Sequence, residues 1–217
     1  MPSPYNALAD ARGESRQHHV RQEVQRHDGR GEKEDNRARE LLVAVQRQLR
    51  RQFGDVLLVL VPRHPERFDR VAGLLRREGL PMLRRSEGQT CDQKCSVYLV
   101  DSMGELPLFL AAADAAFIGG SLVPVGGHNL LEAAAMAVPV AIGPHCFNFA
   151  EITRLLVAAG GAVQLADADA LGPVLAAWLG DAAERARIGE QGFAFVESNR
   201  GALQRLLALL DRELEAT

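Results

Sequence analysis

The sequence has no apolar run long enough to span a bilayer, so we expect any membrane contact to be peripheral. It also has no strong charge of either sign. Its 25 Lys and Arg residues and 28 Asp and Glu residues give a net charge of −3, which removes the electrostatic argument for a nucleic-acid partner. Three cysteines, Cys91, Cys95 and Cys146, without a secretory leader pattern argue against a disulfide framework and favour a reducing cytoplasm.

Several sequence signatures of chemistry are missing too. There is no nucleophile elbow, no His-Glu zinc pattern, no Walker lysine and no Gly-x-Gly-x-x-Gly after a strand. Cys91 and Cys95 have no second Cys or His pair with which to form a metal site. These absences count against hydrolases, metalloproteases, P-loop enzymes and dinucleotide-binding enzymes, and we expect no metal and no cofactor.

What the sequence does have is a regular alternation of helical and strand patterns. With 217 residues and 47% hydrophobic content it can bury one compact core. The apolar run 55–61, closed by Pro62, predicts a buried parallel strand. Further strands are expected at 82–85, 97–100, 114–118, 138–142 and 162–165, and helices at 41–53, 66–78, 104–113, 129–137, 148–159 and 168–215, the last with a break near Asn199 and Gly201 before a helix at Leu203–Leu214. This alternation predicts an α/β fold with a doubly wound parallel sheet.

The first part of the chain differs in composition from the rest. From Ala11 to residue 39 nearly every position is polar or charged, which is typical of a disordered segment. We therefore divide the chain into a leader, residues 1–39, and a folded domain, residues 40–217. The leader's histidines His18, His19 and His27 offer only a weak case for metal binding.

Loops that follow strands are where a doubly wound sheet binds ligands, and four such loops carry unusual residues. After the strand 55–61, Arg63 and His64 emerge in a proline-stiffened loop, where a guanidinium can take a phosphate or carboxylate. After the strand 97–100, Ser102 and Glu105 have the spacing of a helix capping box. Gly104 between them favours close approach of a ligand to the backbone.

The glycine-rich loop 119–128 after the fourth of these strands is the richest. Its two glycine pairs leave backbone N–H groups to face an anion, and the helix that follows begins close by. Asn129 and Glu132 again have capping spacing, so Glu132 either caps the helix or accepts hydrogen bonds from ribose hydroxyls. His128 is either a donor to phosphate or sugar or a structural residue.

A fourth loop follows the strand 138–142. It ends in Asn148 and Glu151, which again have the spacing of a cap. Phe147 and Phe149 flank Asn148, and we interpret both as core anchors rather than platforms for stacking a base.

Taken in this order, the loops resemble the C-terminal domain of 3-deoxy-D-manno-octulosonic acid (Kdo) transferases, which are GT-B glycosyltransferases. The segments that carry the resemblance are VPRHPERF (61–68), DSMGEL (101–106), FIGGSLVP (117–124), GGHN (126–129), GPH (143–145) and FNFAE (147–151). The resemblance implies a Rossmann-like C-terminal half of a GT-B fold, a CMP-Kdo donor, a lipid A precursor as acceptor, and inverting transfer without a metal in lipopolysaccharide biosynthesis.

The same resemblance assigns roles to particular residues. It places Arg63 near the donor's phosphate or sugar, Met103 and Gly104 near the nucleotide, Gly120 and Ser121 in the phosphate loop, and Asn129 with Glu132 on the CMP. The full set expected to bind substrate is Arg63, His64, Met103, Gly104, Glu105, Gly120, Ser121, Gly127, His128, Asn129 and Glu132. No catalytic residue is expected in this chain, because the family's general base lies in its N-terminal domain.

The departures from the family are at the N-terminal side. The family's N-terminal domain, with its acceptor surface and membrane anchor on the cytoplasmic face of the inner membrane, has no counterpart here. The family's first apolar strand also has none, because residues 27–35 cannot form a buried strand. One possibility is therefore that the sheet lacks its first strand. Another is that residues 1–39 come from a shifted reading frame or a truncated gene. The alternatives to half of a Kdo transferase are a catalytically silent nucleotide-binding remnant and a related GT-B protein such as a nucleotide-sugar epimerase.

Overall fold

The structure, a computed structural model, describes residues 19–24 and 32–200. Its centre is a parallel sheet of seven strands in the order β3-β4-β2-β1-β5-β6-β7. The strands are β1 (His19–Val24), β2 (Leu57–Pro62), β3 (Met82–Arg84), β4 (Val97–Leu99), β5 (Ala115–Ile118), β6 (Val140–Ile142) and β7 (Ala162–Gln164). The predicted doubly wound parallel sheet is therefore confirmed.

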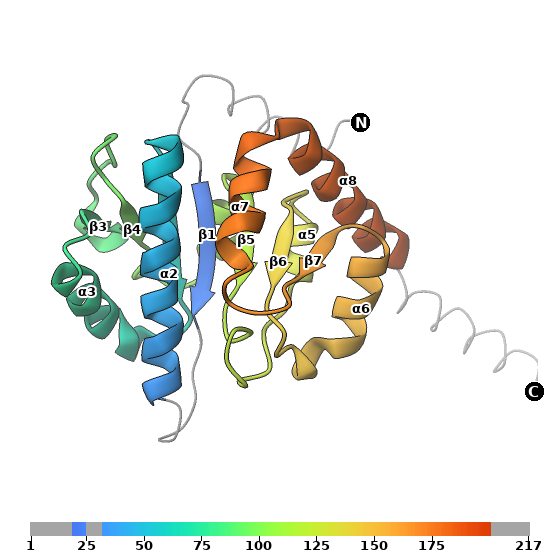
Figure 1. Cartoon of the computed structure of the whole chain (residues 1–217), viewed down its shortest axis with the longest axis horizontal. Helices are drawn as coiled ribbons and strands as arrows, with labels where there is room; N and C mark the ends of the chain where they lie inside the picture. Colours follow the sequence, from blue (N-terminus) through green and yellow to red (C-terminus); the bar gives the residue numbers. More distant parts are fainter. Residues whose placement is uncertain (1–18, 25–31, 201–217) are drawn as a thin grey trace, which may run out of the picture.

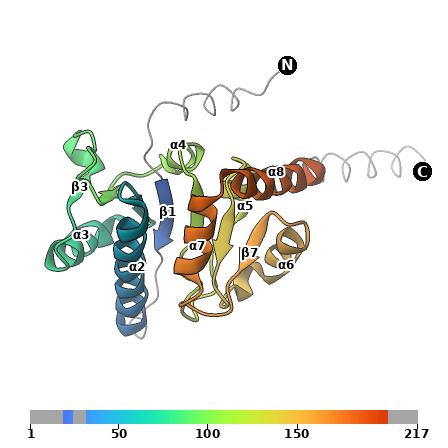
Figure 2. The same cartoon turned by 45° about the horizontal axis from the view of Figure 1, so that its top comes forward.

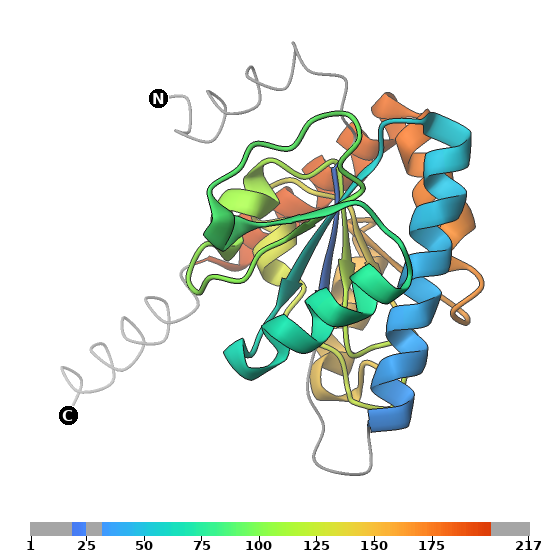
Figure 3. The same cartoon turned by 90° about the vertical axis from the view of Figure 1, so that its left-hand side faces the viewer.

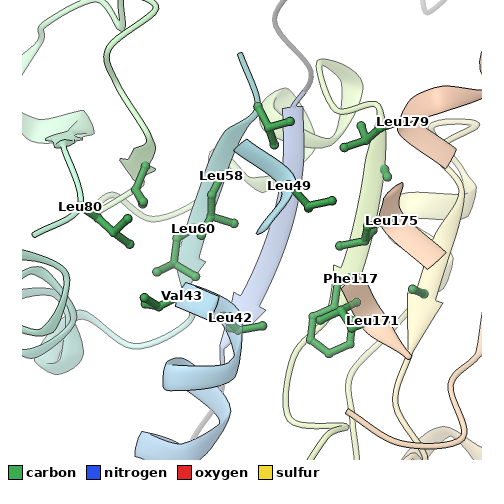
Figure 4. Packing of buried hydrophobic residues seen from close by; sticks show 14 of the residues in the cluster. Leu42, Val43, Leu49, Leu58, Leu60, Leu80, Phe117, Leu171, Leu175 and Leu179 are labelled. Carbon is green, nitrogen blue, oxygen red and sulfur yellow. The ribbon is translucent and has the colours of Figure 1, made fainter. Parts of the chain in front are cut away.

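Helices cover both faces of the sheet (Figures 1 and 3). They are α2 (Glu32–Phe53), α3 (Phe68–Arg77), α4 (Leu106–Ala111), α5 (Leu131–Ala134), α6 (Ala150–Ala158), α7 (Leu171–Gly180) and α8 (Ala182–Asn199), with 3-10 turns η2 (Pro65–Arg67), η3 (Arg85–Glu87) and η4 (Phe147–Phe149). One apolar cluster joins α2, α3 and α7 to β2 and β5, as the leucines of α2 and α7 show in Figure 4. A second cluster joins α4, α5 and α6 to β5 and β6 on the opposite face.

The central strand β1 corrects the expectation that the sheet lacks its first strand. It lies between β2 and β5 and pairs with both in parallel, with His19 opposite Leu57 and Val20 opposite Ala115. The sheet thus has a first strand, and the expectation that it is missing is wrong. The strand comes earlier in the chain than residues 27–35, where we looked for it.

The physical reason is backbone pairing. The N–H and C=O groups of β2 and β5 on their facing edges need partners, and any six residues in extended conformation supply them. The apolar content of a segment is therefore a weaker criterion for locating a strand than the need of neighbouring strands for backbone pairing. The proposed boundary after residue 39 also falls inside α2, which begins at Glu32. Residues 1–18 and 25–31 of the expected leader, His18 and His27 among them, and the expected helix Leu203–Leu214 lie outside the described residues.

Helix α8 packs against α5 and α7 (Figure 2), and glycines allow the close approach. A Cβ atom on Gly189 would lie 2.1 Å from the carbonyl oxygen of Ala137, in the turn that leads to β6. By contrast, nothing lies within 4 Å of a Cβ atom on Gly180, the last residue of α7. The two positions therefore form a matched pair of helical glycines.

We expect Gly189→Ala to lower the free energy of unfolding by about 2 kcal/mol, because overpacking outweighs the gain in helix propensity. Gly180→Ala should instead leave it unchanged or raise it by about 0.5 kcal/mol. Urea denaturation followed by circular dichroism measures both. Equal effects of the two substitutions would contradict the packing of α8 on Ala137.

Candidate functional site

The sheet changes its winding direction at β1. The strands β2, β4 and β3 lie on one side of β1, and the later strands β5, β6 and β7 lie on the other side. Ligands of doubly wound folds bind at such a switch point, beyond the carboxyl ends of the strands. In Figure 1 the long loop after β5 lies at this end, near the tip of the β1 arrow.

The conformation of the glycine-rich loop after β5 is fixed by a hydrogen bond within the loop and by hydrogen bonds from Asn148 in η4. Gly120 and Gly127 both have positive φ, 68° and 72°, and the Gly127 N–H donates to the Gly120 carbonyl at 2.9 Å. The Asn148 N–H donates to the Gly126 carbonyl at 3.1 Å, and its side-chain amide donates to the Val125 carbonyl at 3.3 Å. The loop thus has a shape fixed by its own backbone and by Asn148, which the sequence had suggested only as a cap.

Ser121 connects the loops after β5 and β6. Its side chain is fully buried, and its hydroxyl donates to the Ile118 carbonyl and accepts from the Gly143 N–H at 2.8 Å. The Ser121 carbonyl also accepts from the His145 N–H at 2.9 Å. Both hydrogen-bonding capacities of this hydroxyl are used inside the protein, so Ser121 shapes the site through its neighbours.

His128 ends the glycine-rich loop as a buried side chain, 4% exposed. Its Nε2 atom has no hydrogen-bond partner among the residues that the structure describes. The pKa of His128 is lowered to about 4, mainly by burial and then by Arg63 and His64, which act in the same direction. Arg63 is exposed and His64 partly exposed in the loop after β2. Three groups that can carry positive charge therefore act on one another across the switch point.

Asn129 and Glu132 lie at the start of α5. The Asn129 side-chain carbonyl accepts from the Leu131 N–H at 3.1 Å, and its amide donates to the Glu132 carboxylate at 3.3 Å. The N-cap residue Leu130 makes no side-chain hydrogen bond, so Asn129 rather than Glu132 serves the first N–H of α5. Glu132 is exposed, and with Asn129 it lines a crevice against Leu106 and Leu110 of α4. The geometry leaves the Glu132 carboxylate open to a ligand rather than occupied with its own helix end.

The loop after β4 differs from the expectation in two ways. Helix α4 begins at Leu106, so Gly104 precedes it and serves a turn with φ of 81°, with nothing within 4 Å of an added Cβ atom. Glu105 forms no capping box, because its carboxylate pairs with the Arg85 guanidinium, with nitrogen-to-oxygen distances of 2.8 and 3.2 Å, and accepts from the Ser102 hydroxyl. Arg85 and then Ser102 lower the pKa of Glu105. Met103 is 59% exposed at the tip of the loop.

The loop after β6 corrects one interpretation. Phe149 packs against the second apolar cluster, as expected of a core anchor. Phe147 is 61% exposed, so its interpretation as a core anchor is wrong. A Cβ atom on Gly126 would lie 2.7 Å from Cε2 of Phe147, so this ring lies against Gly126 of the glycine-rich loop. The three cysteines are free thiols.

In sequence, the chain is similar to several Kdo transferases. The chain is 46% identical over 177 residues to the 3-deoxy-D-manno-octulosonic acid transferase of Haemophilus influenzae, covering 81% of this chain and 42% of the relative. It is 40% identical over 156 residues to the transferase of the same name from Bordetella pertussis, covering 71% and 36%. The crystal structure of the C-terminal CMP-Kdo binding domain of WaaA from Acinetobacter baumannii superposes with a TM-score of 0.76 at 28% identity, covering 88% of this chain and 95% of that one.

The chain is homologous to Kdo transferases. The structure it matches is the C-terminal domain of WaaA, and the expected C-terminal half of a GT-B fold is thereby confirmed. The chain spans less than half the length of the Kdo transferases from H. influenzae and B. pertussis. No protein-family model matches it.

Two properties expected from the sequence concern membranes and metals. Among the helices in residues 32–200, none is both long enough and apolar enough to cross a membrane. In the described part of the chain, no three His, Cys, Asp or Glu side chains lie close enough together to hold a metal ion.

The structure brings most of the predicted site residues to one edge of the sheet. Arg63 and His64 follow β2, Met103, Gly104 and Glu105 follow β4, and Gly120, Ser121, Gly127, His128, Asn129 and Glu132 follow β5. Sequence reasoning missed Arg85, which follows β3 and engages Glu105. No local signal identified it, because the two residues are twenty positions apart.

Proposed function

We propose that this chain is the CMP-Kdo-binding half of a Kdo transferase, which transfers Kdo to lipid A precursor in lipopolysaccharide biosynthesis. The support comes from the relatives named above and from the chain's match to a domain whose title describes CMP-Kdo binding. Transfer itself requires an acceptor site and a general base. We assign both to the part of the relatives that this chain does not cover, and we expect this chain alone to bind donor without transferring it.

The single observation that carries the proposal is the open Glu132 carboxylate beside Asn129, directly after a loop with a fixed backbone. A carboxylate accepts hydrogen bonds only, so it suits the two hydroxyls of a ribose. Backbone N–H groups of the loop around Gly120 and Gly127 suit a phosphate. Ribose and phosphate are adjacent in CMP, as the two features are adjacent in the chain.

The remaining residues suit the other parts of the donor. Arg63 provides a guanidinium, and His64 and His128 provide ring nitrogens, for the phosphate and for the carboxylate of Kdo. When the bond from the anomeric carbon of Kdo to the phosphate breaks, negative charge grows on the departing CMP, and fixed positive groups stabilise it. Exposed Met103 with Gly104 lies at the tip of the loop after β4, where we assign the cytosine. Glu105 and Ser121 hold the loops in place through the contacts described above.

Isothermal titration with CMP tests the donor site directly. We expect binding by the unaltered chain and about a tenfold weaker affinity for Glu132→Gln, since a hydrogen bond to a charged group contributes about 1.5 kcal/mol. Glu151→Gln is the matched control, because Glu151 is an exposed carboxylate paired only with Arg154 on α6. Its affinity for CMP should equal that of the unaltered chain. Absence of CMP binding, or equal affinities of the two variants, would contradict the proposal.

The alternative function is a catalytically silent nucleotide-binding remnant. A transfer assay with CMP-Kdo and lipid A precursor separates the two. Transfer restored by adding the missing half of a related Kdo transferase supports the half-enzyme, and CMP binding without restored transfer supports the remnant. In the half-enzyme, the acceptor half provides peripheral association with the cytoplasmic face of the inner membrane.

A further inference from the structure

We propose that the phosphate-bearing ligand binds together with a proton, which His128 takes up, so that the affinity of the site rises as the pH falls. The inference rests on the proposed function and concerns the regulation of the same site. It begins from an unusual group, a polar side chain 4% exposed whose Nε2 atom has no partner among the described residues. A buried polar atom without a partner is destabilising, and a ligand that supplies the partner removes this cost.

The surroundings of His128 determine its charge. The charged groups that act on it are Arg63 and His64, both from the loop after β2. Neither Glu132 on α5 nor His145 in the loop after β6 contributes to the shift. Burial, Arg63 and His64 all act against the charged form and no carboxylate compensates, so the imidazole is neutral when the site is empty, in keeping with its pKa of about 4.

A bound phosphate favours the protonated form of His128 in two ways. Its negative charge offsets Arg63 and His64, and it offers an acceptor to the imidazolium, which has a donor on each ring nitrogen. Both effects favour the protonated form and raise the pKa of His128 in the complex. Binding and protonation are therefore linked, and the linkage is reciprocal.

The size of the effect follows from the two protonation states. If the phosphate returns His128 to an ordinary pKa of about 6.5–7, the complex carries about half a proton or more on this residue at pH 6.5, whereas the empty site carries almost none. The affinity should then rise about four- to tenfold between pH 8 and pH 6.

The probe should not titrate in this range. CMP itself is a phosphomonoester with a second pKa of about 6, so its methyl phosphodiester, which lacks that proton, is the better ligand. Isothermal titration of the chain with this diester at pH 6.5, in two buffers of different ionisation enthalpy, gives the number of protons taken up. Titration at pH 8 and pH 6 gives the change in affinity.

Two histidine variants distinguish the source of the proton. We expect uptake of about half a proton in the unaltered chain, loss of this uptake in His128→Gln, and its retention in His64→Gln. Binding without uptake, or uptake that persists in His128→Gln, would overturn the inference while the proposed function stands. Absence of binding of both CMP and its diester would overturn the proposed function and the inference with it. The buffer comparison on the unaltered chain remains decisive if His128→Gln does not fold.

Discussion

Gly143→Ala should lower the free energy of unfolding by about 3–4 kcal/mol and abolish CMP binding under conditions where the variant still folds. Gly143 is the first residue after β6, and a Cβ atom there would lie 2.2 Å from the Ser121 carbonyl oxygen, 2.5 Å from its carbonyl carbon and 2.9 Å from the Leu122 nitrogen. All three are backbone atoms, so no side-chain rotation relieves the overlap. The glycine-rich loop and the loop after β6 would have to separate.

Separation of the two loops also breaks their hydrogen bonds. The Gly143 N–H would lose the Ser121 hydroxyl, and the His145 N–H would lose the Ser121 carbonyl. The loss of CMP binding is expected because the same displacement moves the backbone that we assign to the phosphate.

A control and two measurements make this prediction specific. Gly73→Ala in α3 meets only the flexible end of Arg77, at 3.7 Å, and should be neutral or slightly stabilising. Guanidinium denaturation gives the stability, and isothermal titration with CMP gives the affinity. A Gly143→Ala variant within about 0.5 kcal/mol of the unaltered chain would show that the two loops are not in contact.

The sequence predicted those elements whose side chains form a period over several turns or a continuous apolar run. Strand β2 was found in this way, because all six of its residues are buried. Short elements were predicted too long. The helix expected at 129–137 is only α5, Leu131–Ala134, and the helical tail divides at Asp181, whose carboxylate accepts from the Glu184 N–H to start α8. The local hydrogen bond of Asp181 thus separates two helices at a position where the hydrophobic pattern alone predicts one continuous helix.

Strand β1 shows the opposite limit. Its sequence, HVRQEV, contains two valines among polar residues, so neither composition nor alternation distinguishes it from the residues around it. What places it is the space between β2 and β5, which depends on residues almost a hundred positions later in the chain. Pairing of this kind depends on backbone groups, which every residue other than proline carries in full.

The sequence predicted where the candidate site lies, but it did not predict which of the site's side chains remain open to a ligand. Glycine pairs after a strand indicated the loop, and the order of strands explains why the loops after β2, β4 and β5 meet. Which side chains stay open to a ligand depends on partners far away in sequence. Glu105 is engaged by Arg85, whereas Glu132, with similar spacing from a predicted cap, remains exposed.

Asp101→Asn should lower the free energy of unfolding by about 3 kcal/mol at neutral pH, because it removes one partner of a buried ion pair. The Asp101 side chain is 2% exposed and accepts from Arg84 Nε at 2.6 Å, from the Ser86 N–H at 2.8 Å and from the Ser86 hydroxyl at 2.6 Å. An amide can accept through only one of its two polar atoms, so at least one of these donors loses its partner. Asp101 begins the loop that carries Met103, so CMP binding should weaken as well.

Asp69→Asn is a matched control, because Asp69 pairs with the same Arg84 at 2.8 Å but is 91% exposed. Its effect should stay within about 0.5 kcal/mol. The pH dependence gives a second criterion. Burial raises the pKa of Asp101, but the hydrogen bonds from Ser86 and Arg84 outweigh it, and the pKa lies below its usual value.

A lowered pKa in the folded protein means that the ionised carboxylate stabilises the fold at and above about pH 4, where it is charged in both states. This contribution is lost as the pH falls through the lower pKa of the folded state. The difference in stability between the unaltered chain and Asp101→Asn should therefore be constant from pH 7 to pH 5 and shrink below pH 4. Urea denaturation at a series of pH values measures it. A difference that equals that of Asp69→Asn at pH 7 would show that the buried network around Asp101 does not hold the loop after β4 in place.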